Sequence, residues 1–341
     1  MSAQPAHLAI TASAQPATAA PALRPSLTSQ RSTRRVEFEP RYGGGRCGVE
    51  VSYLWHGAPD APTVIVQGGI SASRDVLTAA GSEAPGWWQA LVGEGKAVDL
   101  RHCRVLAIDW LTPAELGSAG SVSSEDQANA LSALVDALGI GRVSAFIGSS
   151  YGAMVALAFA ALHPYQVDRL VLLAGAHRAH PISTALRSVQ RGIVRLGQSS
   201  GQLDEALSLA RQLAMTTYRG SEEFARRFAA APELREDRFH FPVEDYLDQA
   251  GRRFVERFDA ERFLALSESI DLHDVQPESV PTPATLIGFP SDRLVPLADL
   301  CELQRRLHGP ATLAVVESPY GHDAFLKEIE QLAPLLREAL A

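Results

Sequence analysis

The run Gly148-Ser-Ser150-Tyr-Gly152 places a serine between two glycines in the pattern Gly-x-Ser-x-Gly. Apolar residues at 143–147 predict a strand before it, and small apolar residues at 153–161 predict a helix after it. Glycines at these positions let strand and helix approach without a Cβ clash, and the sharp turn exposes the serine hydroxyl at the helix N-terminus. A plain Gly/Ser turn before a helix is the alternative, so the prediction that Ser150 is a nucleophile depends on its partners.

A nucleophilic serine needs a base, and the base needs a carboxylate to orient it. Asp292 follows the predicted strand at 284–289, and His322 follows the predicted strand at 312–318. The chain order serine, acid, histidine is the order that accompanies this serine motif. Because the carboxyl ends of parallel strands meet at one edge of a sheet, the three side chains can converge there. The sequence predicts Ser150, Asp292 and His322 as a catalytic triad.

Other acids and histidines fit these roles less well. Asp109 follows an earlier strand, which is too early in the chain order, and a turn position is the alternative for it. Asp323 is adjacent to His322 and is expected to face another way. His177 and His180 follow a middle strand, where substrate contact or helix capping suits them better than service as a base.

Acyl transfer also needs two backbone N–H groups that stabilise the oxyanion of the tetrahedral intermediate. Tyr151, directly after the serine, is the first expected donor. The second is expected in the loop after the strand at 63–66, where the pair Gly68-Gly69 allows close backbone approach and Gly69 is the predicted donor. An ordinary turn between strand and loop is the alternative for this glycine pair.

Composition excludes several classes of partner. The net charge is −8 and no basic cluster is long enough to follow a phosphate backbone, which argues against nucleic acid. No apolar run approaches the roughly 18 residues that span a bilayer. Cys47, Cys103 and Cys301 have neither metal-ligand nor disulfide spacing, which suits a reducing compartment. We therefore expect a cytoplasmic protein without a metal or bound cofactor and without a membrane partner.

The chain divides by pattern into three parts. Residues 1–34 are rich in Ala, Pro, Ser, Thr and Gln and are predicted to form a disordered low-complexity tail. Residues 35–175 and 282–341 are predicted to form the core, with an early hairpin at 36–39 and 49–55 followed by strands that alternate with helices. The predicted strands are 63–66, 104–109, 143–147, 169–174, 284–289 and 312–318. Residues 176–281 lack the strand pattern and are predicted to form a helical lid, with helices such as 203–218 and 224–230.

Several longer phrases resemble the homoserine O-acyltransferases, a branch of the α/β-hydrolase superfamily. They lie at 86–96, 134–140, 243–251, 254–259, 271–274 and 321–326, and they include the tryptophan pair Gly86-Trp-Trp-Gln. The resemblance implies an α/β-hydrolase fold, with a mostly parallel central sheet, helices on both faces and an inserted helical lid. It implies acyl transfer from an acyl-CoA to the hydroxyl of L-homoserine for methionine biosynthesis, by a ping-pong mechanism on the predicted triad.

The resemblance also implies residues that bind the acceptor. It assigns Arg191 to the homoserine carboxylate and Asp323 to its amine, which suits a guanidinium and a carboxylate. A solvated helix arginine is the alternative for Arg191, since Arg187 and Arg195 are near it. We expect a homodimer formed through the lid.

The acyl donor is less sharply defined, because the chain departs from the family beside the site. The oxyanion loop has Gln67-Gly-Gly-Ile-Ser71 in place of a His-Ala-Leu-Thr-Gly-like phrase, and the usual Gly-rich loop after Asp109 is missing. The chain resembles most a short-form subgroup assigned to succinyl transfer. Arg293, directly after the triad acid, is predicted to select succinyl-CoA by pairing with its free carboxylate; a solvent-facing arginine, or one paired with Asp271, is the alternative.

Other reactions could use the same triad. An acetyltransferase acting on homoserine, an acyltransferase acting on serine and a hydrolase of small esters all need an activated serine. A non-catalytic binding protein of this fold is a further alternative, and the intact triad argues against it.

Overall fold

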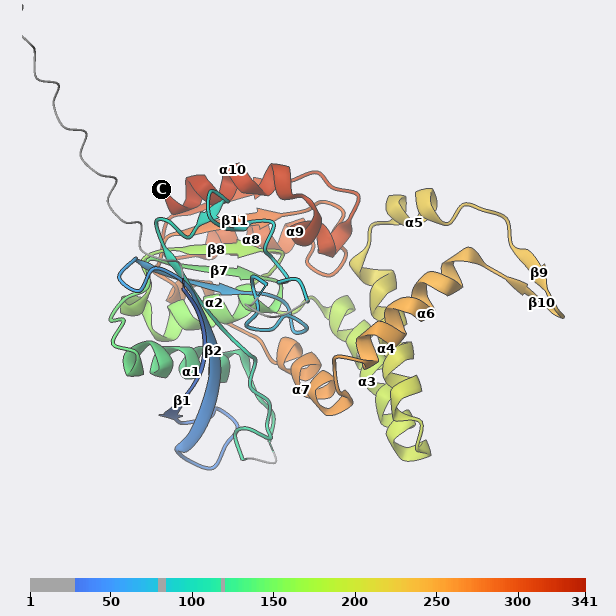
Figure 1. The fold of residues 1–341 in the computed structure, drawn as a ribbon, viewed down its shortest axis with the longest axis horizontal. Coiled ribbons are helices and arrows are strands. Elements are labelled where there is room, and N and C mark those ends of the chain that lie inside the picture. The colour runs from blue at the N-terminus through green and yellow to red at the C-terminus, as the bar shows by residue number, and fades with distance from the viewer. Residues whose placement is uncertain (1–27, 79–83, 118–119) are drawn as a thin grey trace, which may run out of the picture.

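The computed structural model describes residues 28–78, 84–117 and 120–341. Within these ranges an eight-stranded sheet has the order β1-β2-β6-β3-β7-β8-β11-β12 (Figure 1). Its strands are β1 (Thr28–Phe38), β2 (Cys47–Gly57), β3 (Thr63–Gln67), β6 (Arg104–Ile108), β7 (Ala145–Ser149), β8 (Leu170–Leu173), β11 (Ala284–Gly288) and β12 (Ala311–Val315). Strand β2 pairs antiparallel with both β1 and β6, and the other pairs are parallel. The predicted fold class, a mostly parallel sheet in an α/β-hydrolase arrangement, is confirmed.

The start of the sheet differs from the predicted boundary. Strand β1 begins at Thr28, so residues 28–34 belong to a long hairpin with β2 and not to the predicted tail. Residues 29–34 are polar and largely exposed, so they carry no alternating apolar signal. Backbone pairing with β2 holds them in the sheet. The rest of the predicted tail, residues 1–27, lies outside the described residues.

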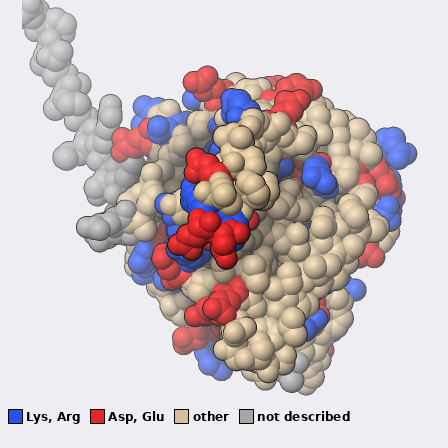
Figure 2. All heavy atoms as spheres, turned by 90° about the vertical axis from the view of Figure 1, so that its right-hand side faces the viewer, with Lys and Arg blue, Asp and Glu red and all other residues tan. Residues whose placement is uncertain are grey.

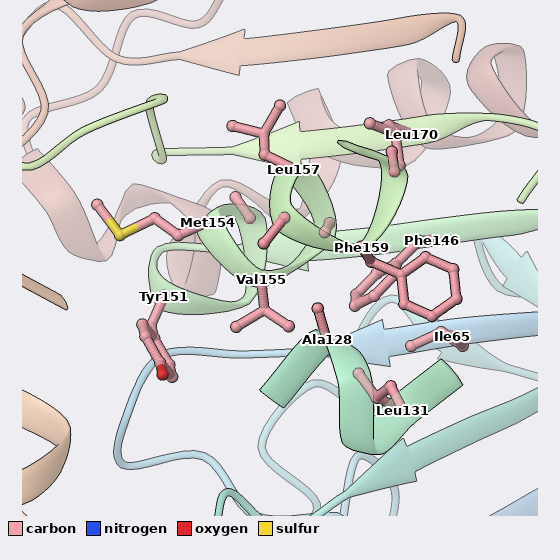
Figure 3. Packing of buried hydrophobic residues seen from close by; sticks show 14 of the residues in the cluster. Ile65, Ala128, Leu131, Phe146, Tyr151, Met154, Val155, Leu157, Phe159 and Leu170 are labelled. Carbon is pink, nitrogen blue, oxygen red and sulfur yellow. The ribbon is translucent and has the colours of Figure 1, made fainter. Parts of the chain in front are cut away.

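Alternation along the buried strands divides the core into two apolar layers. In β3, Ile65 faces one layer while Val64 and Val66 face the other. The first layer holds α1 (Ser124–Ala137), α2 (Tyr151–Leu162) and α8 (Leu297–Arg306), and the second holds α9 (Ala324–Lys327) and α10 (Ile329–Leu340). Figure 3 shows α2 beside α1, with Val155 near Ala128. This packing fixes the position of α2, and with it the position of Ser150, the residue directly before the helix.

In chain order the lid lies between β8 and β11, and in space it lies to one side of the sheet (Figure 1). It contains α3 (Pro181–Ser200), α4 (Leu203–Tyr218), α5 (Ser221–Arg227), β9 (Glu233–Arg235), β10 (Arg238–His240), α6 (Pro242–Val255) and α7 (Ala260–Asp271). Helix α4 has the predicted bounds, and α5 begins three residues before the predicted 224. The short hairpin β9–β10, which projects from the lid, was not predicted, because each strand has only three residues.

The outer surface of the lid carries exposed apolar side chains. Ile182, Val189 and Leu196 of α3 are seven residues apart and each is more than half exposed, so they form one strip along the helix. Figure 2 looks onto the lid end of the molecule and shows a dense cluster of charged side chains beside broad areas that carry none. The homodimer expected through the lid stays a prediction, and this strip is the surface it would use. Of the helices in the described ranges, none combines the length and apolar character that a membrane crossing requires.

Candidate active site

Ser150 occupies a strained turn between β7 and α2. Its φ of 54° and ψ of −120° lie in a region that residues with a side chain rarely adopt. A Cβ on Gly148 would overlap the carbonyl of Gly152, and a Cβ on Gly152 would overlap the carbonyl of Gln67. Both glycines are therefore needed for strand, turn and helix to pack this closely. The sequence pattern predicted this close approach of strand and helix.

A chain of hydrogen bonds joins the three residues predicted as the triad. In the tautomer with its proton on Nδ1, His322 donates to Asp292 Oδ2 at 2.7 Å and accepts from the Ser150 hydroxyl at 2.8 Å. The other carboxylate oxygen, Oδ1, accepts from the N–H groups of Leu294 at 2.8 Å and Val295 at 3.1 Å. Asp292 and His322 are both buried. The arrangement is that of an activated nucleophile.

The charge of Asp292 sets the basicity of the histidine. Burial alone would lower the pKa of His322, but the Asp292 carboxylate outweighs it through its charge and its hydrogen bond, and Asp323 adds to this, so the pKa is raised. A ring with a raised pKa accepts a proton from a hydroxyl more readily than an unperturbed one. The same carboxylate fixes the ring orientation that turns Nε2 toward Ser150.

The loop that carries His322 packs directly against the end of α4. Gly321 has φ of +59°, and a Cβ there would lie 2.8 Å from the backbone nitrogen of Gly220. The N–H of Gly321 donates to Ser291 Oγ at 3.1 Å, which ties the histidine loop to the loop of the triad acid. The Tyr218 ring lies over His322, with centroids 5.9 Å apart. The lid therefore contributes to the position of the base.

The residues predicted to stabilise the oxyanion lie on either side of the serine hydroxyl. A Cβ on Gly69 would lie 3.7 Å from Ser150 Oγ, and Tyr151 is the first residue of α2. Trp110, which the sequence reading did not select, contacts both: its indole donates to the Gly69 carbonyl at 3.0 Å and its ring meets Tyr151 edge to face at 4.9 Å. The donor roles of Gly69 and Tyr151 stay predictions.

Ser150 and His322 open into a cavity of about 500 Å³ between core and lid. Lid helices α3, α4 and α7 and the loop of Gly69 form nearly half of its wall. Within the described residues, its charged wall residues are five cations and two acids, namely Arg178, Arg187, Arg211, Arg219, Lys327, Asp299 and Asp323. This balance suits substrates that carry negative charge.

Arg191 does not lie where the family resemblance implied. It is buried outside the cavity wall, where Nη1 donates to Asp271 Oδ2 at 2.6 Å and to the Ser267 carbonyl at 3.1 Å. A guanidinium enclosed by these partners has no open side for a substrate carboxylate. In this structure Arg191 is paired within the lid, and its assignment to the acceptor carboxylate stays a prediction.

Arg211 of α4 has the position that Arg191 lacks. It lines the cavity, and its guanidinium lies over the rings of Tyr218 at 5.2 Å and Phe254 at 4.8 Å. In the described part of the chain no carboxylate pairs with it within 4.0 Å. It acts electrostatically on Asp323, which also lines the cavity. Sequence reasoning missed Arg211 because an arginine in an amphipathic helix has no distinguishing local pattern.

Asp323 lies in the cavity wall beside His322, although its adjacency to His322 predicted another direction. Its role in binding the acceptor amine stays a prediction. Its carboxylate Oδ2 is 3.0 Å from Arg219 Nε. Burial raises the pKa of Asp323, and Arg219, His322 and Arg211 together do not fully offset that rise. A further cation, such as a substrate ammonium, would stabilise the ionised carboxylate.

Arg293 points away from the cavity. It is exposed and absent from the cavity wall, whereas its neighbours Leu294 and Val295 are buried in that wall. The reason is the turn that Asp292 closes by accepting from the N–H groups of both neighbours, which directs Asp292 inward and Arg293 outward. The prediction that Arg293 selects the acyl donor stays a prediction, and the cavity wall gives it no support.

The weaker candidates have structural partners of their own. Asp109 pairs with Arg74 at 3.2 Å and also accepts from its N–H. His177 is buried 3.7 Å from Glu302. His180 caps α3, which is one of the two roles predicted for His177 and His180. It also lies in the cavity wall, where the other predicted role, contact with the substrate, is open to it.

Fold and site together define an enzyme of the α/β-hydrolase class, and a model of the alpha/beta hydrolase fold family matches residues 62–329. The homoserine O-succinyltransferase of Xanthomonas campestris pv. campestris is 43% identical over 98% of this chain and 91% of its own. The L-serine/homoserine O-acetyltransferase of Streptomyces lavendulae is 34% identical over 89% of this chain and 95% of its own. The chain therefore belongs to the homoserine O-acyltransferase family, as its sequence phrases predicted.

A solved structure supports the fold. The homoserine O-acetyltransferase from Bacillus anthracis superposes with a TM-score of 0.81 over 92% of this chain and 97% of its own. The identity is 19%, so this likeness concerns the fold alone.

Proposed function

We propose that the protein transfers the succinyl group of succinyl-CoA to the hydroxyl of L-homoserine through an ester on Ser150. The hydrogen-bonded chain from Ser150 to Asp292, open to a cavity of net positive charge, carries the proposal. The relative that is 43% identical bears this activity in its name, which supports both donor and acceptor.

The reaction proceeds in two halves. In the first, His322 Nε2 accepts the proton of Ser150 as Oγ attacks the thioester carbonyl carbon. The C–S bond breaks, CoA leaves as a thiol with the proton from His322, and the acyl group remains as an ester. In the second, the homoserine hydroxyl gives its proton to His322 and attacks that ester. The bond to Ser150 breaks, and the serine regains its proton.

The N–H groups of Gly69 and Tyr151 stabilise the oxyanion in both halves. Trp110 holds the loop of the first donor against the ring of the second. The lid limits access of water to the ester, which favours the alcohol acceptor over hydrolysis. The closeness of α4 to the histidine loop supports this role.

The acceptor is held by its two charged groups. Arg211 binds the carboxylate of homoserine, because its guanidinium lines the cavity and has no carboxylate partner within the described chain. Asp323 binds the ammonium, because its carboxylate lines the cavity and a further cation would stabilise its ionised form. This pair replaces the pair of Arg191 and Asp323 inferred from the sequence.

The proposed function is tested by thiol release with defined substrates. Purified protein is mixed with succinyl-CoA or acetyl-CoA, with homoserine, serine or no acceptor, and the products are identified by mass. We expect the fastest release with succinyl-CoA and homoserine, and O-succinylhomoserine as the product. Release of free succinate at the same rate without acceptor would identify an ester hydrolase instead. Faster use of acetyl-CoA or of serine would correct the donor or the acceptor.

Replacing either acceptor residue should impair the second half of the reaction. For Arg211→Ala and Asp323→Ala we expect the KM for homoserine to rise about 10- to 100-fold, the effect of one lost charge-assisted contact. The burst of CoA release without acceptor should persist, because Ser150, His322 and Asp292 keep their hydrogen bonds in both variants. The measurement is stopped-flow thiol detection at several homoserine concentrations.

Arg195→Ala is the matched control, because Arg195 is an exposed arginine of the lid. It should keep both the burst and the KM of the wild type. Loss of the burst in Arg211→Ala or Asp323→Ala, to the extent seen when Ser150 is removed, would show that these residues do not act mainly on the acceptor.

A further inference from the structure

Arg187 extends from α3 into the wall of the cavity, one helical turn before Arg191. Both arginines reach the same carboxylate, Asp271 at the end of α7. Arg187 donates from Nε at 2.8 Å and from Nη2 at 2.6 Å to Oδ1, and Arg191 donates to Oδ2 at 2.6 Å. Asp271 thus holds the Nε and Nη2 edge of the Arg187 guanidinium in place.

These three side chains carry an uncompensated charge. Two guanidinium groups share one carboxylate, and among the described residues neither has a second carboxylate within 4.0 Å. All three side chains are at most 12% exposed. A positive charge that is nearly removed from water and only half paired favours an anion in the adjoining space.

The charge is directed at the cavity. Nη1 of Arg187 has no hydrogen-bond partner in the described chain, and Arg187 is the member of this group that lines the cavity. Two other cations of the wall differ from it: Arg219 pairs with Glu223 and Asp323, and Arg178 is 55% exposed beside Glu302. Arg187 is nearly buried and shares its one carboxylate partner with Arg191. Arg211 is covered by two aromatic rings and has no carboxylate partner among the described residues. Both wall arginines therefore keep positive charge that could bind an anion.

These two arginines suit different carboxylates. Beside Arg211 lies Asp323, an acid that faces the cavity, so that site suits a group carrying both a carboxylate and an ammonium. Beside Arg187 lies Asp271, which is outside the cavity wall and already accepts from both arginines and from Thr184 Oγ1. The Arg187 site therefore suits an anion that has no ammonium.

We propose that Arg187 receives the terminal carboxylate of the succinyl group and thereby selects succinyl-CoA over acetyl-CoA. The inference rests on the proposed function, since it concerns the same ester on Ser150. The guanidinium meets the carboxylate with charge-assisted hydrogen bonds. An acetyl group offers it no partner. Asp271 and Arg191 act as positioning residues that hold the guanidinium. Arg187 also lies near enough to His322 to oppose the rise in its pKa.

The test is the donor preference of Arg187→Met, which removes the charge and keeps much of the length. The ratio of kcat/KM for succinyl-CoA to that for acetyl-CoA, at saturating homoserine, should fall about 10- to 100-fold. Arg195→Met is the control, because it removes an exposed arginine of the same helix, and it should leave the ratio unchanged. An unchanged ratio in Arg187→Met would overturn the inference and leave the proposed function standing.

A second measurement needs no variant. Butyryl-CoA has a methyl group where succinyl-CoA has its carboxylate, so the wild type should use it with a kcat/KM at least about 10-fold lower. Equal use of the two donors would overturn the inference even if Arg187→Met failed to fold. A wild type that transfers no succinyl group from succinyl-CoA would overturn the proposed function and the inference with it.

Discussion

Ser150→Ala should abolish acyl transfer while the protein stays folded. The hydroxyl is the atom that attacks the thioester, and neither His322 nor a water in the same place can form the covalent ester. We expect kcat to fall by about a millionfold, the scale seen when the nucleophile of such a unit is removed. Thiol release measures the loss, and thermal unfolding checks the fold.

Ser149→Ala is the matched control for this variant. Ser149 is the neighbouring serine, but it is buried at the end of β7 and its hydroxyl has no hydrogen-bond partner among the described residues. Its removal should leave the rate near that of the wild type. A folded Ser150→Ala protein with near-normal turnover would rule out the covalent mechanism.

The ester itself can be detected. Wild-type protein treated with succinyl-CoA in the absence of acceptor should gain the mass of one succinyl group on the peptide that contains Ser150. Addition of homoserine should remove that mass and release O-succinylhomoserine. Ser150→Ala should gain no mass under either condition.

The core of the site could be predicted from sequence because its signals are local and mutually consistent. Buried runs marked the strands, and the glycines at 148 and 152 marked a turn that needs close backbone contact. The order of Ser150, Asp292 and His322 then placed three side chains at one edge of the sheet. The described structure joins them by hydrogen bonds of 2.7 and 2.8 Å.

The lid resisted the same reasoning, because the direction of a lid side chain depends on how its helix docks. Arg187 and Arg191 are one turn apart on α3, yet Arg187 reaches the cavity while Arg191 is enclosed by α7. Nothing in their local sequence separates them. Arg211 likewise gains its place from the packing of α4 beside the histidine loop, which involves glycines 101 residues apart, Gly220 and Gly321.

Arg293 illustrates a different limit. Its position next to the triad acid suggested a place beside the substrate, but neighbours in a tight turn face opposite ways. Asp292 accepts from the N–H groups of Leu294 and Val295, and this turn directs Arg293 to solvent. Adjacency in sequence predicted proximity, and the hydrogen bonds of the turn decided the direction.

Asp292→Asn should lower kcat by about 10⁴-fold with little loss of stability. The amide can donate to Nδ1 of His322, which favours the tautomer with its proton on Nε2. That nitrogen then cannot accept the proton of Ser150, to which it is now hydrogen-bonded at 2.8 Å. The rate is measured by thiol release over a range of pH, with unfolding followed in parallel.

The pH profile separates this role from a structural one. In the wild type, burial lowers the pKa of His322, but Asp292, with a further contribution from Asp323, more than reverses this, so the pKa is raised. The neutral ring is the base, so kcat/KM should fall as pH drops through that raised pKa. Without the carboxylate, burial dominates, and the acidic limb of Asp292→Asn should move to lower pH. Asp109→Asn, which alters the pair with Arg74, should keep the acidic limb of the wild type. A limb that stays in place in Asp292→Asn would show that Asp292 does not set the basicity of His322.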